Sequence, residues 1–197
     1  TTRFFANANF PISPQLLLLT VLPIKTYVLV NHLFLYGVGF WGSLRLHSRF
    51  QWSAFSFIVF FILFNFNGMV ISHVAVGHYE WVSYFFLPFF LFFTLKLATQ
   101  EHRTSDKYWL SLVLFAMLLQ GGIHIVNMCL IFLGLLILTN RNIVNFTIVI
   151  VLTLALGLIR FLPATLIYFE KFQYVGFVSL RQFMETSIFI RSADTAQ

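Results

Sequence analysis

The chain has 197 residues, of which 59% are hydrophobic and only 9% charged, and its mean hydropathy is +0.88. Soluble domains carry about 25% charged residues, so this composition excludes an ordinary soluble protein and predicts an integral membrane protein. The formal charge of +6 comes without any basic run and is typical of membrane proteins that meet anionic lipid. We therefore expect a lipid bilayer as partner and no nucleic acid.

The chain divides into three predicted parts. Residues 1–25 are interpreted as an outer-side loop and an interfacial segment, because the apolar run PQLLLLTVLPI is too short to cross about 30 Å of hydrocarbon and contains Pro23. Residues 26–163 are predicted to form an all-α, polytopic membrane bundle. Residues 164–197 mix charged and aromatic side chains and are expected to form a truncated outer-side loop. The chain starts without Met or a signal peptide, which favours a part of a longer protein or a processed one.

The hydrophobic runs predict six membrane helices. They cover residues 26–46, 52–73, 82–98, 108–119, 123–139 and 143–162. Basic residues concentrate in alternate loops, and this bias marks the cytoplasmic side. The loops that contain Arg49, Arg103 and Arg141 are therefore predicted to be cytoplasmic.

Three details of these spans follow from residue spacing. Asn65, Gly68 and Ser72 fall on one helical face of the second span, so this face is expected to pack inward. Pro88 is expected to kink the third span. The sixth span is expected to end at Pro163.

Residues 108–139 are almost uniformly hydrophobic, and a single helix of that length would extend about 48 Å, too long for one ordinary span. The sequence Gln-Gly-Gly at 120–122 lies in the middle of this run. We predict a turn there, near the outer boundary and close to His78. The turn keeps Arg141 on the same side as the other basic loops.

The most polar stretch of the apolar region is residues 65–88, NFNGMVISHVAVGHYEWVSYFFLP. Polar groups near lipid usually face a protein interior or a water-filled cavity, so this stretch is the candidate site. If its link is extended, His78 and Glu80 point to the same side and could share a metal ion, a phosphate-bound cation or a sugar hydroxyl. Asn65 and Asn67 favour a structural role in bonds between helices. The neighbouring aromatic residues favour a belt at headgroup depth: Tyr79, Trp81 and Tyr84.

The turn at 120–122 is the second polar break. Gln120 and His124 either belong to a tight turn, with the imidazole bonded to a backbone carbonyl, or approach the His78–Glu80 pair and help to bind a ligand. Signatures of soluble enzymes such as GxGxxG, GxSxG, HExxH and CxxC are absent. The single cysteine, Cys129, excludes an internal disulfide.

Four segments carry a resemblance to a known family: SPQLLLLTVLP, FNFNGMVISHVAVGHYEWVSYFFLP, LLQGGIHIVNMCLIFLGLLIL and GLIRFLPATLIYFE. Over about residues 11–170 the chain resembles the N-terminal half of bacterial polytopic GT-C-type glycosyltransferases and their membrane relatives. The NG…VGHxxW segment is its most specific part. The family's module begins with one helix and an acidic outer loop, both of which this chain lacks.

The resemblance implies a multi-pass protein of the bacterial cytoplasmic membrane that transfers a sugar from a polyprenyl-phosphate donor on the outer face. A carboxylate base would activate the acceptor, and Glu80 matches the acidic position of the second outer loop. A divalent metal ion, Mg²⁺ or Mn²⁺, bound by Glu80 and His78, or basic groups would stabilise the departing phosphate. Arg160 and Lys171 could meet that phosphate, or they are interfacial basic residues.

Two other functions remain open. The missing acidic loop favours a non-catalytic subunit or relic of this fold among other membrane subunits of a larger complex, where histidines could ligate a pigment or haem. In a transporter, polar breaks such as 120–124 would be half-helix ends at a binding site, but no inverted repeat supports this.

Overall fold

The computed structural model describes residues 12–99, 103–139 and 142–169, with side chains described as far as Leu162. Every regular element in these ranges is a helix, which confirms the predicted all-α class. With η for a 3-10 helix, the elements are η1 (Pro14–Thr20), α2 (Ile24–Phe50), α3 (Ala54–Asn65), α4 (Gly68–Ala75), η2 (Tyr79–Phe86), α5 (Leu87–Ala98), α6 (Asp106–Leu119), α7 (Ile123–Thr139) and α8 (Ile143–Phe169).

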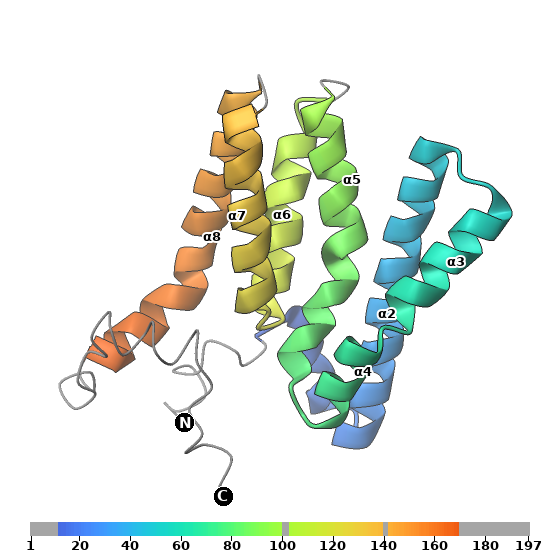
Figure 1. Ribbon diagram of the computed structural model, residues 1–197. Helices are drawn as coiled ribbons and strands as arrows, with labels where there is room; N and C mark the ends of the chain where they lie inside the picture. Colours follow the sequence, from blue (N-terminus) through green and yellow to red (C-terminus); the bar gives the residue numbers. More distant parts are fainter. Residues whose placement is uncertain (1–11, 100–102, 140–141, 170–197) are drawn as a thin grey trace, which may run out of the picture.

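Helices α2 and α5 to α8 stand side by side and form the body of the bundle (Figure 1). α6 is central, because it packs against α5, α7 and α8, and α5 in turn packs against α2. The main core lies around α6, and its fully buried side chains include Leu110, Leu114, Met117, Leu133, Phe146 and Val149. A smaller cluster around Leu35, Phe64 and Phe85 joins α2 to α3 and η2.

Because α2, α3, α5, α6, α7 and α8 alternate in direction, the polar and charged residues gather at the two ends of the bundle (Figure 1). The basic end comprises Arg45, Arg49, Lys96, Arg103 and Lys107. The polar end comprises His78, Glu80, Gln120, His124 and Arg160. Arg49 and Arg103 thus share one end, as the predicted topology requires, whereas Arg141 lies outside the described residues.

Within the described residues, three helical segments are long and apolar enough to cross a membrane: Ala54–Ala75, Tyr79–Ala98 and Ile143–Leu162. They correspond to three of the six predicted spans. α6 has 14 residues and α7 has 17, which gives lengths of about 21 Å and about 26 Å at 1.5 Å per residue. Both are shorter than the roughly 30 Å hydrocarbon core. α2 is long enough at 27 residues but not a candidate span, so six membrane helices are not confirmed.

The predicted second span is broken into α3 and α4. The side chain of Asn67 accepts a hydrogen bond from the backbone N–H of Met69 at 3.0 Å and caps α4. This break changes the register, so Asn65 is buried while Gly68 and Ser72 are exposed. The expected common inward face of these three residues is therefore wrong. Both amide side chains have a structural role, as expected, but neither of these two bonds joins different helices. Asn65 donates to the backbone oxygen of Phe61 within α3, and Asn67 caps α4.

The two prolines behave differently from the predictions. Pro88 occupies the first turn of α5, where a missing N–H leaves no bond unmade, and the change from η2 to α5 occurs there. α8 continues through Pro163 to Phe169, although a proline inside a helix removes one hydrogen bond and its ring clashes with the carbonyl four residues earlier. Residues 164–169 of the expected outer loop are therefore helical.

The predicted turn at 120–122 is confirmed, since α6 ends at Leu119 and α7 begins at Ile123. Gly121 has a φ of +83°, a conformation that glycine adopts without a steric penalty. Gly122 lies so close to η2 that an added Cβ would overlap Ser83. The turn therefore lies beside the segment that contains Glu80, as expected.

Candidate functional site

The polar end is organised around η2. α4 ends at Ala75, and Gly77, with a φ of +93°, reverses the chain before η2 begins at Tyr79. The link is a tight turn and not the extended segment assumed from the sequence. It nevertheless places His78 Nδ1 3.3 Å from Glu80 Oε1.

The two side chains of this pair differ in exposure. The side chain of His78 is 58% exposed, whereas that of Glu80 is 16% exposed. The imidazole ring of His73 lies 5.5 Å from that of His78 and stacks on Trp81. The pair thus consists of an accessible imidazole and a largely enclosed carboxylate, and such a carboxylate is suited to accept a proton from a bound hydroxyl group.

Amide oxygens on both sides of η2 lack partners in the described chain. Asn31 donates from Nδ2 to the hydroxyl oxygen of Tyr79 at 2.6 Å, while its Oδ1 accepts no hydrogen bond. Oε1 of Gln120, in the adjoining turn, likewise accepts none, and both residues are only 1% exposed. Buried acceptors are costly when unpaired, so these oxygens would favour donor groups such as hydroxyls.

Two aromatic residues near the pair contact neighbouring helices. Tyr79 is tied to α2 by the Asn31 hydrogen bond. Tyr84 stacks on Phe64 with ring centres 4.5 Å apart. At least these two tyrosines therefore hold η2 against its neighbours.

The other predicted site residues are spread over the polar end. Gln120 is buried in the turn, and His124 is exposed in the first turn of α7. Arg160 is buried on α8, at 4% exposure. η2 packs on α2, α4, α6 and α7, whereas α8 packs on α6 and α7. Lys171 lies outside the described residues.

The donor set does not by itself make a metal site. Among the described residues, no group of three or more His, Cys, Asp or Glu side chains could hold a metal ion. His78 and Glu80 supply one nitrogen and one carboxylate, whereas Mg²⁺ prefers six oxygen ligands, often including substrate phosphates. The remaining ligands of the expected ion would have to come from a substrate or from other residues.

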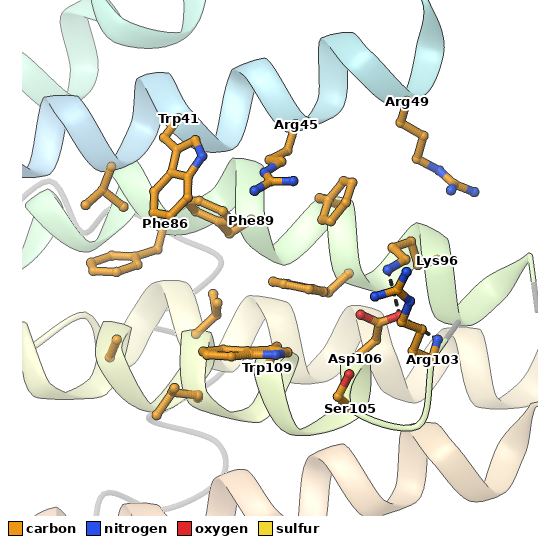
Figure 2. Close-up of a pocket in the computed structure, with 16 residues that line it drawn as sticks. Trp41, Arg45, Arg49, Phe86, Phe89, Lys96, Arg103, Ser105, Asp106 and Trp109 are labelled. Carbon is orange, nitrogen blue, oxygen red and sulfur yellow. Dashed lines mark hydrogen bonds and ion pairs between the residues drawn. The ribbon is translucent and has the colours of Figure 1, made fainter. Parts of the chain in front are cut away.

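A cavity of about 890 Å³ lies at the basic end, between α2, α5 and α6 (Figure 2). Its walls are mainly apolar and aromatic, and cationic side chains gather toward its end near Arg103. Its lining residues include Trp41, Arg45, Arg49, Phe86, Lys96, Arg103, Asp106, Trp109 and Ala116. The sequence predicted a cavity at the opposite end, beside His78 and Glu80.

One buried ion pair organises the mouth of this cavity. Lys96 Nζ lies 2.7 Å from Asp106 Oδ2, and the backbone N–H of Arg103 donates to the same oxygen at 2.7 Å. These contacts join the end of α5 to the start of α6 (Figure 2). Arg45 lies instead over the ring of Trp41, 5.7 Å from its centre.

A signal for this cavity was present in the sequence. Trp41, Arg45 and Arg49 are spaced four residues apart, so they lie along one helical face. The two arginines were interpreted only as markers of the cytoplasmic side. Their position on one helical face with Trp41 was therefore not recognised as a sign of a shared binding surface.

Comparison of the chain with protein-family models, with curated proteins and with solved structures found no match. The GT-C-type resemblance therefore depends on the sequence segments that carry it.

Proposed function

We propose that this chain is part of a bacterial membrane glycosyltransferase of the GT-C type, which takes a sugar from a polyprenyl-phosphate donor at the polar end. The observation that supports this best is the enclosed carboxylate of Glu80, 3.3 Å from the imidazole of His78. The unpaired acceptors of Asn31 and Gln120 lie on either side of the same segment. A sugar offers hydroxyl donors that such oxygens require.

In this proposal Glu80 is the base. Its carboxylate accepts the proton of the acceptor hydroxyl, the acceptor oxygen bonds to the sugar's anomeric carbon, and the bond from that carbon to the phosphate oxygen breaks. His78 hydrogen-bonds the carboxylate and holds its orientation. Arg160 and Lys171 remain candidates for contact with the departing phosphate, and a divalent ion at the pair remains an expectation of the resemblance.

Replacement of Glu80 by Gln tests the role of the carboxylate. In the full-length protein, Glu80→Gln should lower turnover about 100-fold or more, since general bases contribute about 10²–10⁴-fold. The amount of folded protein, followed by size-exclusion chromatography, should stay unchanged because Gln has nearly the same shape. Tyr79→Phe, next to it, should have a much milder effect. Wild-type turnover in Glu80→Gln would remove this residue from the site.

We further propose that the basic end faces the cytoplasm and the polar end faces outward, in line with the positive-inside bias. Cysteines introduced at Ser48 and Ser105 should then resist a membrane-impermeant maleimide in intact cells. A cysteine at Val76, exposed at the polar end, should react readily and serves as the control. The native Cys129 is buried. Labelling at Ser48 or Ser105 but not at Val76 would reverse the orientation.

A second candidate function is a non-catalytic subunit of a larger membrane assembly. Glu80 is the only carboxylate of the polar end among the described residues, whereas the resembling enzymes carry further acidic residues in their first outer loop. The Glu80→Gln comparison separates the two candidates, because a subunit without catalysis would tolerate this change in an otherwise active assembly.

A further inference from the structure

We infer that the cavity at the basic end binds an anionic phospholipid, with the phosphate headgroup at its cationic mouth and one acyl chain along its aromatic wall. This site lies at the opposite end from Glu80 and does not depend on the function proposed above.

The charges that line the cavity favour an anionic ligand. Among the described residues, four cationic side chains line the cavity, Arg45, Arg49, Lys96 and Arg103, and one carboxylate does so, that of Asp106. That carboxylate is already engaged, because it accepts contacts from Lys96 and from the backbone of Arg103. Cationic charge therefore exceeds anionic charge at the mouth, and guanidinium groups are well suited to bind phosphate oxygens.

The arrangement of the cationic groups supports this. Arg45 projects from α2 toward the space between α5 and α6, and Trp41 and Trp109 lie on facing walls beside it (Figure 2). Within the described chain, no carboxylate lies within ion-pairing distance of the Arg45 guanidinium. An anion at the mouth would supply the missing partner.

The length of the cavity and the apolar character of its wall favour a lipid over a soluble phosphate. The cavity extends from Lys96 on α5 to Phe86 at the end of η2, ten residues or about 15 Å at 1.5 Å per residue. This is half of the roughly 30 Å hydrocarbon core, and therefore the depth of one leaflet. The wall over that distance is apolar and mostly aromatic, ending near Ala116. A soluble phosphate would use the mouth alone and leave this wall exposed.

The test uses the fluorescence of the two tryptophans of the cavity. The full-length protein is placed in phosphatidylcholine nanodiscs, with Trp52, Trp81 and every tryptophan outside these 197 residues replaced by Phe, so that Trp41 and Trp109 alone report. A minor fraction of brominated phosphatidylglycerol, or the same fraction of brominated phosphatidylcholine, is then added. We expect the anionic lipid to quench the two tryptophans more strongly at equal content. Equal quenching would overturn the proposal.

Matched variants decide whether the cationic mouth causes this preference. Arg45→Gln and Arg103→Gln should each weaken it about fivefold, as expected for one basic residue near an anionic headgroup. Lys107→Gln removes the same charge at the same end but outside the cavity, and should leave the preference unchanged. An equal loss in Lys107→Gln would mean that only the overall surface charge matters, which contradicts the proposal.

Soluble glycerol phosphate distinguishes the two phosphate sources. If it abolishes the difference between the brominated lipids, the site binds a soluble phosphate and the lipid assignment is wrong. If another protein segment fills the cavity instead, the two brominated lipids will quench the tryptophans equally. The lipid assignment is then wrong as well. If brominated phosphatidylglycerol still quenches more strongly when glycerol phosphate is present, the result supports a bound lipid.

Discussion

Alanine in place of Gly122 is expected to destabilise the folded bundle by about 2 kcal/mol, within the range for overpacked interiors. An added Cβ would overlap both Oγ and Cβ of Ser83. Rotation of the Ser83 side chain could move its Oγ but not its Cβ, and Ser83 is fully buried. Relief therefore requires η2 to separate from the α6–α7 turn, so thermal unfolding in detergent should shift to a lower temperature.

Two variants control this experiment. Gly37→Ala is the matched change on α2, where nothing lies within 4 Å of the added Cβ, and it should be neutral or slightly stabilising because alanine favours helix. Ser83→Gly added to Gly122→Ala removes the obstructing atoms and should recover part of the lost stability. Unchanged unfolding in Gly122→Ala would show that η2 and the turn are farther apart than described.

A second large loss is expected from Asp106→Asn. The Asp106 side chain is 5% exposed, and its carboxylate lies 2.7 Å from Lys96 Nζ. Removing one member of a buried ion pair costs about 3–5 kcal/mol, because the other charge is left without a partner. We expect about 3 kcal/mol, at the low end, since Lys96 is 19% exposed and can reach water.

The pair can be isolated by a double-mutant cycle. Lys96→Met alone leaves the carboxylate buried and should also destabilise the bundle. The double variant Lys96→Met, Asp106→Asn should lose less stability than the sum of the two single variants, because no unpaired charge remains. Strict additivity in thermal unfolding would show that the two side chains do not interact.

Features set by a few adjacent residues could be predicted from the sequence. The Gln-Gly-Gly sequence at 120–122 required a turn because glycine adopts positive φ freely, and Gly121 does so. The His78–Glu80 contact was also predictable, because residues two positions apart meet in several backbone conformations. The assumption of an extended link was wrong, because the link is a tight turn. The two side chains nevertheless lie close together, with His78 Nδ1 3.3 Å from Glu80 Oε1.

Features that depend on distant partners could not be predicted. The sequence offered Asn65 and Asn67 as similar amides, but only Asn67 caps a helix. The hydroxyl of Tyr36, on α2, donates to the backbone oxygen of Asn65 at 2.9 Å. Because a long-range contact fixes this end of α3, hydropathy alone could not show where the helix breaks.

The candidate site shows the same division. Glu80 and His78 are close in sequence, whereas the cavity joins side chains from α2, α5 and α6, such as Arg45, Lys96 and Trp109. No local pattern states that these helices are neighbours. The charges themselves were evident, but the positive-inside bias explained them equally well without any cavity.

If α6 and α7 cross the bilayer, as the sequence predicts, their short lengths should affect the lipid around the protein. α7 exposes a row of apolar side chains, Met128, Ile131, Leu135 and Leu138, but at about 26 Å it is shorter than the surrounding hydrocarbon. Such hydrophobic mismatch is relieved by local thinning of the bilayer, at fractions of a kcal/mol per Å. The membrane beside α7 should therefore be compressed by a few ångströms, and the protein should prefer thin membranes to thick ones.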